Sequence, residues 1–136
     1  MIYLLDTNTL SYVVKGRSPA ARERLGLLGP KDIVCISSTT EAEVRYGLAR
    51  RPQAHALRAA MERMLLKVRT LSWGSAEAAA YGELRAGLEA QGIVLAELDL
   101  LIAAQAKAAD AVLVTSDKAF LQLAGLIAME NWATDI

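Results

Sequence analysis

A short apolar run at the start of the chain, ended by an acid, most restricts the folds open to this sequence. Residues Ile2–Leu5 are continuously apolar, and so short a run is typical of a strand buried on both faces of a parallel sheet. The run stops at Asp6, and Thr9–Val14 can form a helix directly after it. Ligands of open α/β sheets bind beyond the carboxyl ends of the strands, so Asp6 occupies a position suited to a functional site. Asp6 is equally suited to capping the helix, and its sequence context leaves both roles open.

The remaining chain alternates between short apolar runs and helical stretches. Besides the first strand, we expect strands at 32–36, 68–71, 111–114 and 126–129. We expect helices at 9–14, 19–28, 41–49, 53–67, 75–91, 97–109 and 118–124, with Leu25, Leu27 and Leu28 on the buried side of the second. This alternation predicts a parallel, doubly wound α/β fold in a single domain spanning residues 1–136.

Composition excludes several classes of protein and site. The chain is 54% hydrophobic, which supports a substantial core, yet no apolar run approaches the roughly 18 residues of a membrane span. The start of the chain has no basic region, so we expect no signal peptide. The single cysteine, Cys35, cannot form an internal disulfide, and we expect it to pack in the core of a cytoplasmic protein. One cysteine and one histidine, His55, leave little support for zinc sites or for Ser-His and Cys-His catalysis.

Charge is distributed unevenly along a chain whose net charge is zero. Residues 1–69 carry twelve Lys and Arg against six Asp and Glu, whereas residues 70–136 carry three against nine. Such asymmetry points to a polyanionic partner for the first half. It is also consistent with two halves that neutralise each other after folding, and the charges alone leave both interpretations open.

Two further acids, Glu43 and Asp99, lie at or near the start of a predicted helix. Ser38 and Glu41 have the spacing of a capping box, which gives Glu41 a structural role, although Thr40 and Glu43 share that spacing. Asp99 lies in the first turn of an almost wholly apolar helix. The helix dipole favours a charge there by only about 0.3–1 kcal/mol, which is small against the cost of desolvating a carboxylate. We therefore expect Asp99 to have a strong partner.

A fourth acid, Asp117, again follows a predicted strand, where it could equally cap a helix. Because parallel strands share one carboxyl edge, Asp6, Glu43, Asp99 and Asp117 could converge there. Two unit charges about 4 Å apart repel by roughly 4 kcal/mol at an effective dielectric of 20, and a divalent cation would relieve this repulsion. All-oxygen ligands favour Mg²⁺ or Mn²⁺, which can activate water and stabilise a phosphoryl transition state. The polar groups expected around the acids are Thr7, Asn8, Thr115 and Ser116.

Four motifs in this order resemble those of PIN-domain ribonucleases. They are Asp6-Thr-Asn8, Ala42-Glu43-Val-Arg-Tyr-Gly47, Asp99-Leu-Leu-Ile-Ala-Ala104 and Val114-Thr-Ser-Asp117. Together with the closing Gly125-Leu126 and Glu130-Asn-Trp132, they are most similar to the VapC toxins of toxin–antitoxin pairs. The similarity covers almost the whole chain, although Ala96 and Ser116 replace the glycine and asparagine of many relatives.

The resemblance implies a three-layer α/β/α sandwich and a Mg²⁺- or Mn²⁺-dependent endoribonuclease. Asp6 and Asp99 would be the main metal ligands, Glu43 would complete the site and help activate water, and Asp117 would be the fourth acid. It further implies a structured RNA substrate such as tRNA, a small VapB-like antitoxin, and a homodimer. Four arginines of the basic half become candidates for RNA or antitoxin contacts: Arg45, Arg50, Arg51 and Arg58.

Three other functional classes begin from similar features. A phosphatase of the haloacid-dehalogenase type also starts with a strand and an acid, but it needs a second acid where Asn8 stands. A receiver-like signalling module pairs two acids at one strand end, and Asp6 has no acidic neighbour. A non-catalytic binding module would keep the fold without metal-dependent cleavage.

Overall fold

A parallel sheet forms the centre of the protein, for which a computed structural model describes all 136 residues. The five strands are β1 (Ile2–Leu5), β2 (Ile33–Ser37), β3 (Arg69–Leu71), β4 (Val112–Val114) and β5 (Met129–Glu130). Their spatial order is β3-β2-β1-β4-β5, and every neighbouring pair is parallel. The predicted parallel α/β fold is therefore confirmed.

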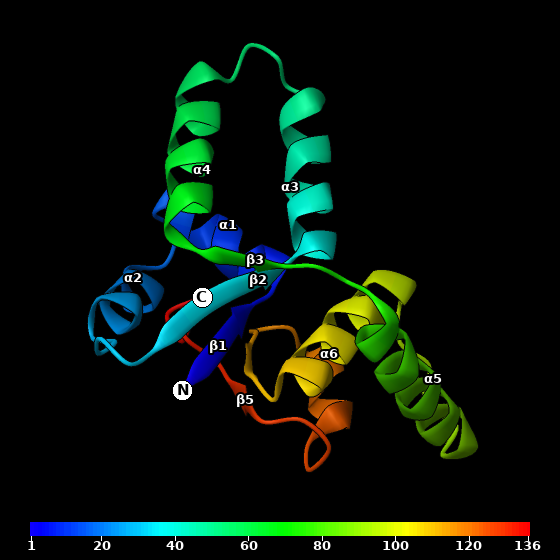
Figure 1. The fold of residues 1–136 in the computed structure, drawn as a ribbon. Helices are drawn as coiled ribbons and strands as arrows, with labels where there is room; N and C mark the ends of the chain where they lie inside the picture. The colour runs from blue at the N-terminus through cyan, green and yellow to red at the C-terminus, as the bar shows by residue number, and fades with distance from the viewer.

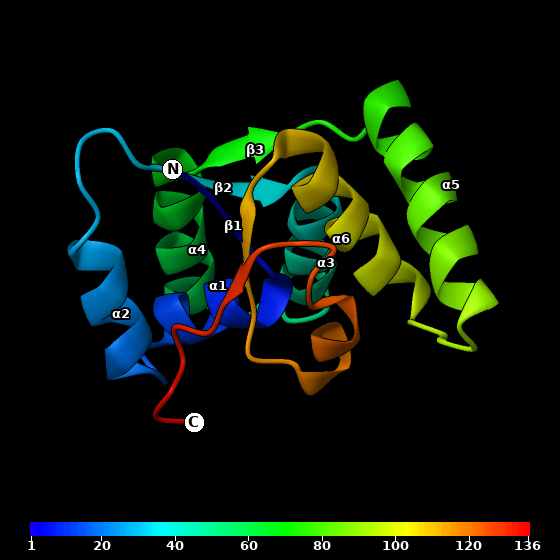
Figure 2. The same cartoon turned by 90° about the horizontal axis from the view of Figure 1, so that it is seen from below.

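Helices cover both faces of this sheet (Figures 1 and 2). They are α1 (Thr7–Lys15), α2 (Pro19–Gly26), α3 (Ser38–Ala49), α4 (His55–Lys67), α5 (Ser75–Ala90) and α6 (Glu97–Ala109), with a 3₁₀ helix at Lys118–Leu123. Helices α3 and α4 form a hairpin that projects from the sheet, and α5 packs against α6 on the opposite side (Figure 1). No helix is long and apolar enough to cross a membrane.

The strand alternation divides the core into two layers. Tyr3 and Leu5 of β1 point into a cluster formed with α1, α2, α3 and α4. Leu4, between them, points into a second cluster formed with α5, α6 and the 3₁₀ helix, and Cys35 of β2 lies in the same cluster. Both faces of the central strand are thus buried, which explains its unbroken apolar sequence. Burial raises the pKa of the Cys35 thiol to about 11, as expected for a packing residue.

Helix boundaries near the start of the chain follow the capping signals. The Asp6 carboxylate accepts a hydrogen bond from the Thr9 amide at 2.8 Å, so it does cap α1. Gly16 ends the helix with φ of +68°, a left-handed conformation that costs glycine little. Ser18 then caps α2 by accepting from the Ala21 amide at 3.0 Å.

Besides small shifts of helix ends, the structure differs from the sequence predictions in the following details. Helix α2 ends at Gly26, which leaves the Leu27 side chain 72% exposed instead of buried. Ser37, and neither Ser38 nor Thr40, caps α3, because β2 runs one residue further than expected. The last helix is a 3₁₀ helix, and the last strand spans only Met129–Glu130, since the chain first turns at Gly125 with φ of +86°.

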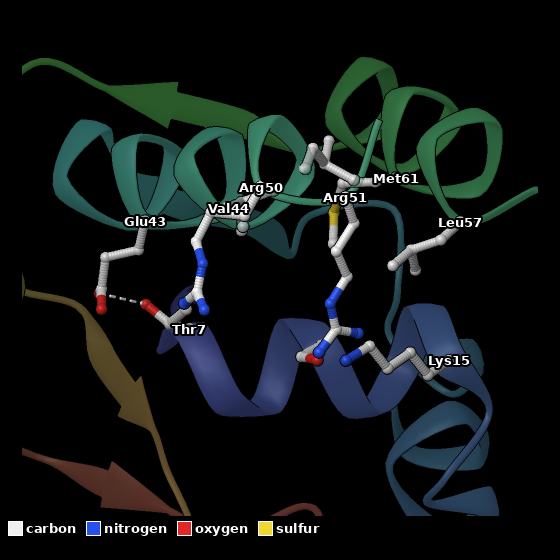
Figure 3. A pocket seen from close by; sticks show the side chains of 11 residues that line it. Thr7, Lys15, Glu43, Val44, Arg50, Arg51, Leu57 and Met61 are labelled. Atoms are coloured by element: carbon white, nitrogen blue, oxygen red, sulfur yellow. Dashed lines mark hydrogen bonds between the residues drawn. The ribbon is translucent and has the colours of Figure 1, made fainter. Parts of the chain in front are cut away.

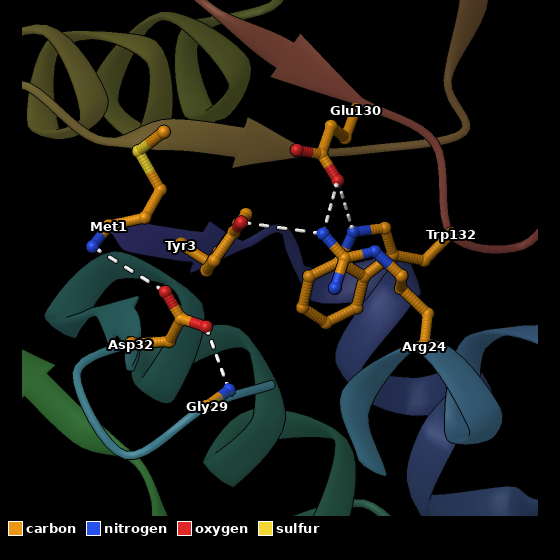
Figure 4. Close-up of polar contacts among 7 residues, drawn as sticks. All are labelled: Met1, Tyr3, Arg24, Gly29, Asp32, Glu130 and Trp132. Carbon is orange, nitrogen blue, oxygen red and sulfur yellow. Dashed lines mark hydrogen bonds and ion pairs between the residues drawn. The ribbon is translucent and has the colours of Figure 1, made fainter. Parts of the chain in front are cut away.

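Arg24 fastens the C-terminal segment to the sheet (Figure 4). Its guanidinium lies 5.4 Å from the centre of the Tyr3 ring and 5.2 Å from that of Trp132, and it pairs with Glu130 at 3.1 Å. Trp132 is only 3% exposed and donates its indole N–H to the same Glu130 carboxylate at 2.9 Å. Residues at opposite ends of the chain are therefore held in one packed unit.

We expect Trp132→Ala to lower the free energy of unfolding by about 3–5 kcal/mol, because it empties a buried aromatic site and removes a cation–π partner. Urea denaturation followed by circular dichroism measures this change. Leu27→Ala is the matched control, and its change should stay within about 0.5 kcal/mol because the side chain is exposed. Equal losses in the two variants would contradict the packing role of Trp132.

Candidate active site

The topology of the sheet brings the predicted acids to one edge. The chain enters the sheet at β1 and builds outward through β2 and β3, then returns to β4 on the other side of β1. The boundary between β1 and β4 is a topological switch point, where open α/β sheets bind ligands. Asp6 and Asp117 follow these two strands, and the Asp6 amide donates to the Val114 carbonyl at 3.0 Å.

Asp6 is the most enclosed of the four acids, with only 4% of its surface exposed. Burial raises the pKa of its carboxyl, and the nearby negative charge of Asp117 raises it further. The Thr115 hydroxyl, the Thr9 amide and the Thr9 hydroxyl act in the opposite direction by stabilising the charged form. The Asp6 carboxylate therefore caps α1 and also lies near another acid. Capping the helix and serving a functional site, the two roles that the sequence left open, do not exclude each other.

Glu43 is tied to the end of β1 through Thr7. The Thr7 hydroxyl donates to Glu43 Oε1 at 2.7 Å (Figure 3). It also lies 3.3 Å from the Thr40 hydroxyl. The neighbouring Glu41 points elsewhere and pairs with Arg45 at 3.0 Å. The expected capping box of Ser38 and Glu41 is therefore wrong, because Ser37 caps the helix. The two glutamates do make different contacts, Glu43 with Thr7 and Glu41 with Arg45.

Asp99 shows that all four acids share one electrostatic environment. Burial at the start of α6 raises the pKa of its carboxyl, and the charges of Asp117, Glu43 and Asp6 raise it further, in that order. Helix α6 is buried along its middle, but its first turn is more open and Leu98 is 45% exposed. Asp99 is thus half-buried, and its strong interactions are with other acids instead of a cationic protein group.

Asp117 combines a structural contact with its place beside the other acids. Its carboxylate accepts from the Ala119 amide at 2.9 Å and caps the 3₁₀ helix, while its own amide donates to the Thr115 hydroxyl at 3.0 Å. Thr115 thereby connects the Asp117 backbone with the Asp6 carboxyl. By contrast, Asn8 is exposed, and neither Asn8 nor Ser116 makes a side-chain hydrogen bond within the chain.

One positioning residue was missed by the sequence analysis. Gln105 of α6 is 2% exposed, accepts from the Ser37 hydroxyl at 2.9 Å and donates to the Ser72 carbonyl at 3.2 Å. It therefore fixes α6, which carries Asp99, to the ends of β2 and β3. A glutamine within the apolar run of a buried helix was the available signal, because a buried amide needs partners.

The donor chemistry of this site fits a hard divalent cation. All four acids offer carboxylate oxygens, the ligands that Mg²⁺ and Mn²⁺ prefer, and the mutual repulsion felt at Asp99 is what such a cation would relieve. In this structure no group of three or more Asp, Glu, His or Cys side chains is arranged to hold a metal ion. Asp6, Glu43, Asp99 and Asp117 are the residues that would hold the ion.

The four candidate arginines divide into two pairs. Arg45 bridges Glu41 at 3.0 Å and Glu62 at 3.3 Å, and Arg58 donates to the Leu48 carbonyl at 3.1 Å, so both have structural partners. Arg50 and Arg51 instead line a cavity of about 220 Å³ that lies between α1, α3 and α4. Glu43 and Thr7 form part of the same cavity wall, so it adjoins the acidic site (Figure 3).

Comparisons with known proteins identify the family of this chain. Residues 3–126 match the family model described as PIN domain. The chain is 34% identical over 133 residues to "Ribonuclease VapC2" of Rickettsia felis, an alignment covering 97% of this chain and 98% of that protein. It is 29% identical over 131 residues to "tRNA(fMet)-specific endonuclease VapC" of Shigella flexneri, covering 96% and 98%.

A solved structure shares the whole fold. The crystal structure of VapBC2 from Rickettsia felis bound to a promoter DNA fragment superposes with a TM-score of 0.89 at 31% identity, covering 97% of this chain and 99% of that one. The predicted PIN-like sandwich is therefore confirmed. The chain belongs to the PIN-domain family, within which it is similar to the VapC ribonucleases over nearly its full length.

Proposed function

We propose that the protein is a Mg²⁺- or Mn²⁺-dependent endoribonuclease that acts as the toxin of a toxin–antitoxin pair. The observation that carries this proposal is the set of acids around Asp99, whose pKa is raised by burial and then by the charges of Asp117, Glu43 and Asp6. Burying like charges close together is unfavourable. In a nuclease that binds a cation between the carboxylates, the cation offsets this cost, and the acids are needed for activity. The family match supports the reaction class.

Each residue has a definite part in this proposal. Asp6 and Asp99 supply the main carboxylate ligands, and Asp117 supports them from the end of β4. Glu43, oriented by the Thr7 hydroxyl, accepts a proton from the attacking water. A bound ion would lower the pKa of water and offset the charge of the scissile phosphate.

The names of relatives guide the choice of substrate and partner. Because the Shigella flexneri relative is named for tRNA(fMet), initiator tRNA is the first RNA to test. The Rickettsia felis structure is a VapBC complex, which supports a VapB-like antitoxin for this chain. RNA cleavage and a single buried thiol at Cys35 fit a cytoplasmic location.

Asp6→Asn and Asp99→Asn should each abolish RNA cleavage while preserving the fold, since each removes a proposed metal ligand. Cleavage of initiator tRNA by the purified proteins, with Mg²⁺ and with chelator, measures the first expectation. Circular dichroism measures the second. Undiminished cleavage by both variants would overturn the site assignment.

Glu43→Gln should reduce kcat by about 10²–10⁴-fold, because it removes the proposed proton acceptor. Glu41→Gln is the matched control on the same helix. It loses only an exposed ion pair with Arg45, worth about 0.2–0.5 kcal/mol, and should cleave at the wild-type rate. If Glu41→Gln lost activity and Glu43→Gln kept it, Glu41 would be the glutamate that serves the site.

In the absence of metal, Asp99→Asn should be more stable than the wild type at pH 7. The net pKa shift of Asp99 is upward, so burial and like charges outweigh the favourable dipole of α6. The penalty exists only while the carboxylate is ionised, and the gap should close as the pH falls towards 3.8, the ordinary value for aspartate.

Thermal unfolding across this pH range measures the gap, and adding Mn²⁺ should stabilise the wild type but not Asp99→Asn. If the difference in stability between Asp99→Asn and the wild type widened as the pH fell, the proposed destabilisation by the ionised Asp99 carboxylate would be contradicted. Equal stabilisation of both proteins by Mn²⁺ would contradict the ligand role.

A further inference from the structure

Two hollows in the protein surface share Glu43 as a wall, and they differ in charge. The first lies between α3 and α6 and is lined by hydroxyl and apolar groups such as Thr39 and Leu98, without any cationic side chain. The second is the cavity between α1, α3 and α4, and it carries Lys15, Arg50 and Arg51. An RNA strand that passes the acidic site must continue beyond it, and only the second hollow offers positive charge.

The three cations of this cavity are free of acidic partners. Each is exposed, and none has a carboxylate within 4.0 Å. Arg51 and Lys15 extend toward one another across the cavity, and Arg50 lies on the side of Thr7 and Glu43 (Figure 3). Arg45, which holds the fold, is paired with Glu41 and Glu62. The charges of Lys15 and Arg51 have no such partner, and Arg50 contacts only the Tyr46 ring, 5.5 Å from its centre, so all three charges are available to a phosphate.

The folded chain places the three charges together although they come from separate segments. Lys15 is the last residue of α1, while Arg50 and Arg51 directly follow α3. Helix α1 rises about 1.5 Å per residue, so its nine residues place Lys15 roughly 12 Å along the axis from Thr7. That span accommodates more than one phosphate of a nucleic acid strand.

The acidic site creates a need for this arrangement. Four carboxylates repel a polyanion even when a divalent ion offsets part of their charge, and the phosphates on either side of the cleaved bond receive no help from that ion. A row of cations beginning beside Glu43 would compensate the repulsion where the strand leaves the site. Phosphate contacts of this kind position a nucleic acid without reading its sequence.

We propose that Lys15, Arg50 and Arg51 form a phosphate track that binds the RNA backbone on one side of the cleaved bond. This proposal rests on the proposed RNA cleavage. It adds the direction in which the substrate strand leaves the acidic site. An acidic peptide could meet the same cations, but a strand held at Glu43 must continue into an adjoining hollow, whereas a peptide need not. The track therefore assigns these residues to substrate binding and excludes Arg45 and Arg58.

The test compares Lys15→Gln, Arg50→Gln, Arg51→Gln and the triple variant in steady-state cleavage of initiator tRNA. Arg63→Gln, an exposed arginine of α4 outside the cavity, is the matched control. We expect the triple variant to raise KM at least tenfold with kcat within about threefold, since ground-state phosphate contacts are lost. The slope of log(kcat/KM) against log salt should fall by about 0.7–0.9 for each phosphate contact removed.

Binding of uncleaved tRNA to the Asp6→Asn protein, with and without the triple substitution, provides an independent readout. Weaker binding with a reduced salt slope supports the track. The proposal would be overturned if the triple variant left KM, tRNA binding and the salt slope unchanged. The same holds if only its affinity for the antitoxin fell, because the cavity would then bind a peptide. Failure of the wild-type protein to cleave any RNA would instead count against the proposed function.

Discussion

The repulsion among four carboxylates at the β1–β4 boundary is the constraint to which the surrounding structure responds. Asp6 is almost fully enclosed, and its unfavourable burial is offset by the Thr9 amide and the Thr115 hydroxyl. Asp99 has no cationic partner, and its pKa is raised by burial and, to a smaller extent, by the charges of the other three acids. Under the proposed function a divalent cation would offset these like charges, so the cost of burying the acids would be regained when the ion binds.

The supporting contacts around the acids come from residues that fix one element to another. Thr7 links the start of α1 to Glu43 of α3, and Gln105 links α6 to the ends of β2 and β3. Backbone hydrogen bonds between β1 and β4 set the distance between Asp6 and Asp117. The relative positions of the acids therefore depend on the parallel sheet as a whole, and each helix delivers at most one of them.

The uneven charge of the sequence acquires a spatial meaning in the fold. The two halves do not neutralise each other everywhere, because Lys15, Arg50 and Arg51 line one cavity without a carboxylate partner and Glu43 is the one acid in its wall. Arg45 and Arg58, equally basic in sequence, are used in an ion pair and a helix contact. Charge counting pointed to a polyanionic partner but could not tell a free arginine from a paired one.

The parallel α/β fold and the strand at Ile2–Leu5 could be predicted from the sequence, because the pattern of apolar residues is a local property of the chain. The same patterns selected the four acids as a candidate site, which stays a prediction. The sequence also separated Glu43 from Glu41, although for a capping reason that proved wrong. The exposure of Leu27, the partners of Gln105 and the arginines without a carboxylate partner became known from the folded structure alone. Those properties depend on contacts between segments distant in sequence, so a local pattern can suggest that Gln105 needs a partner but cannot say which one.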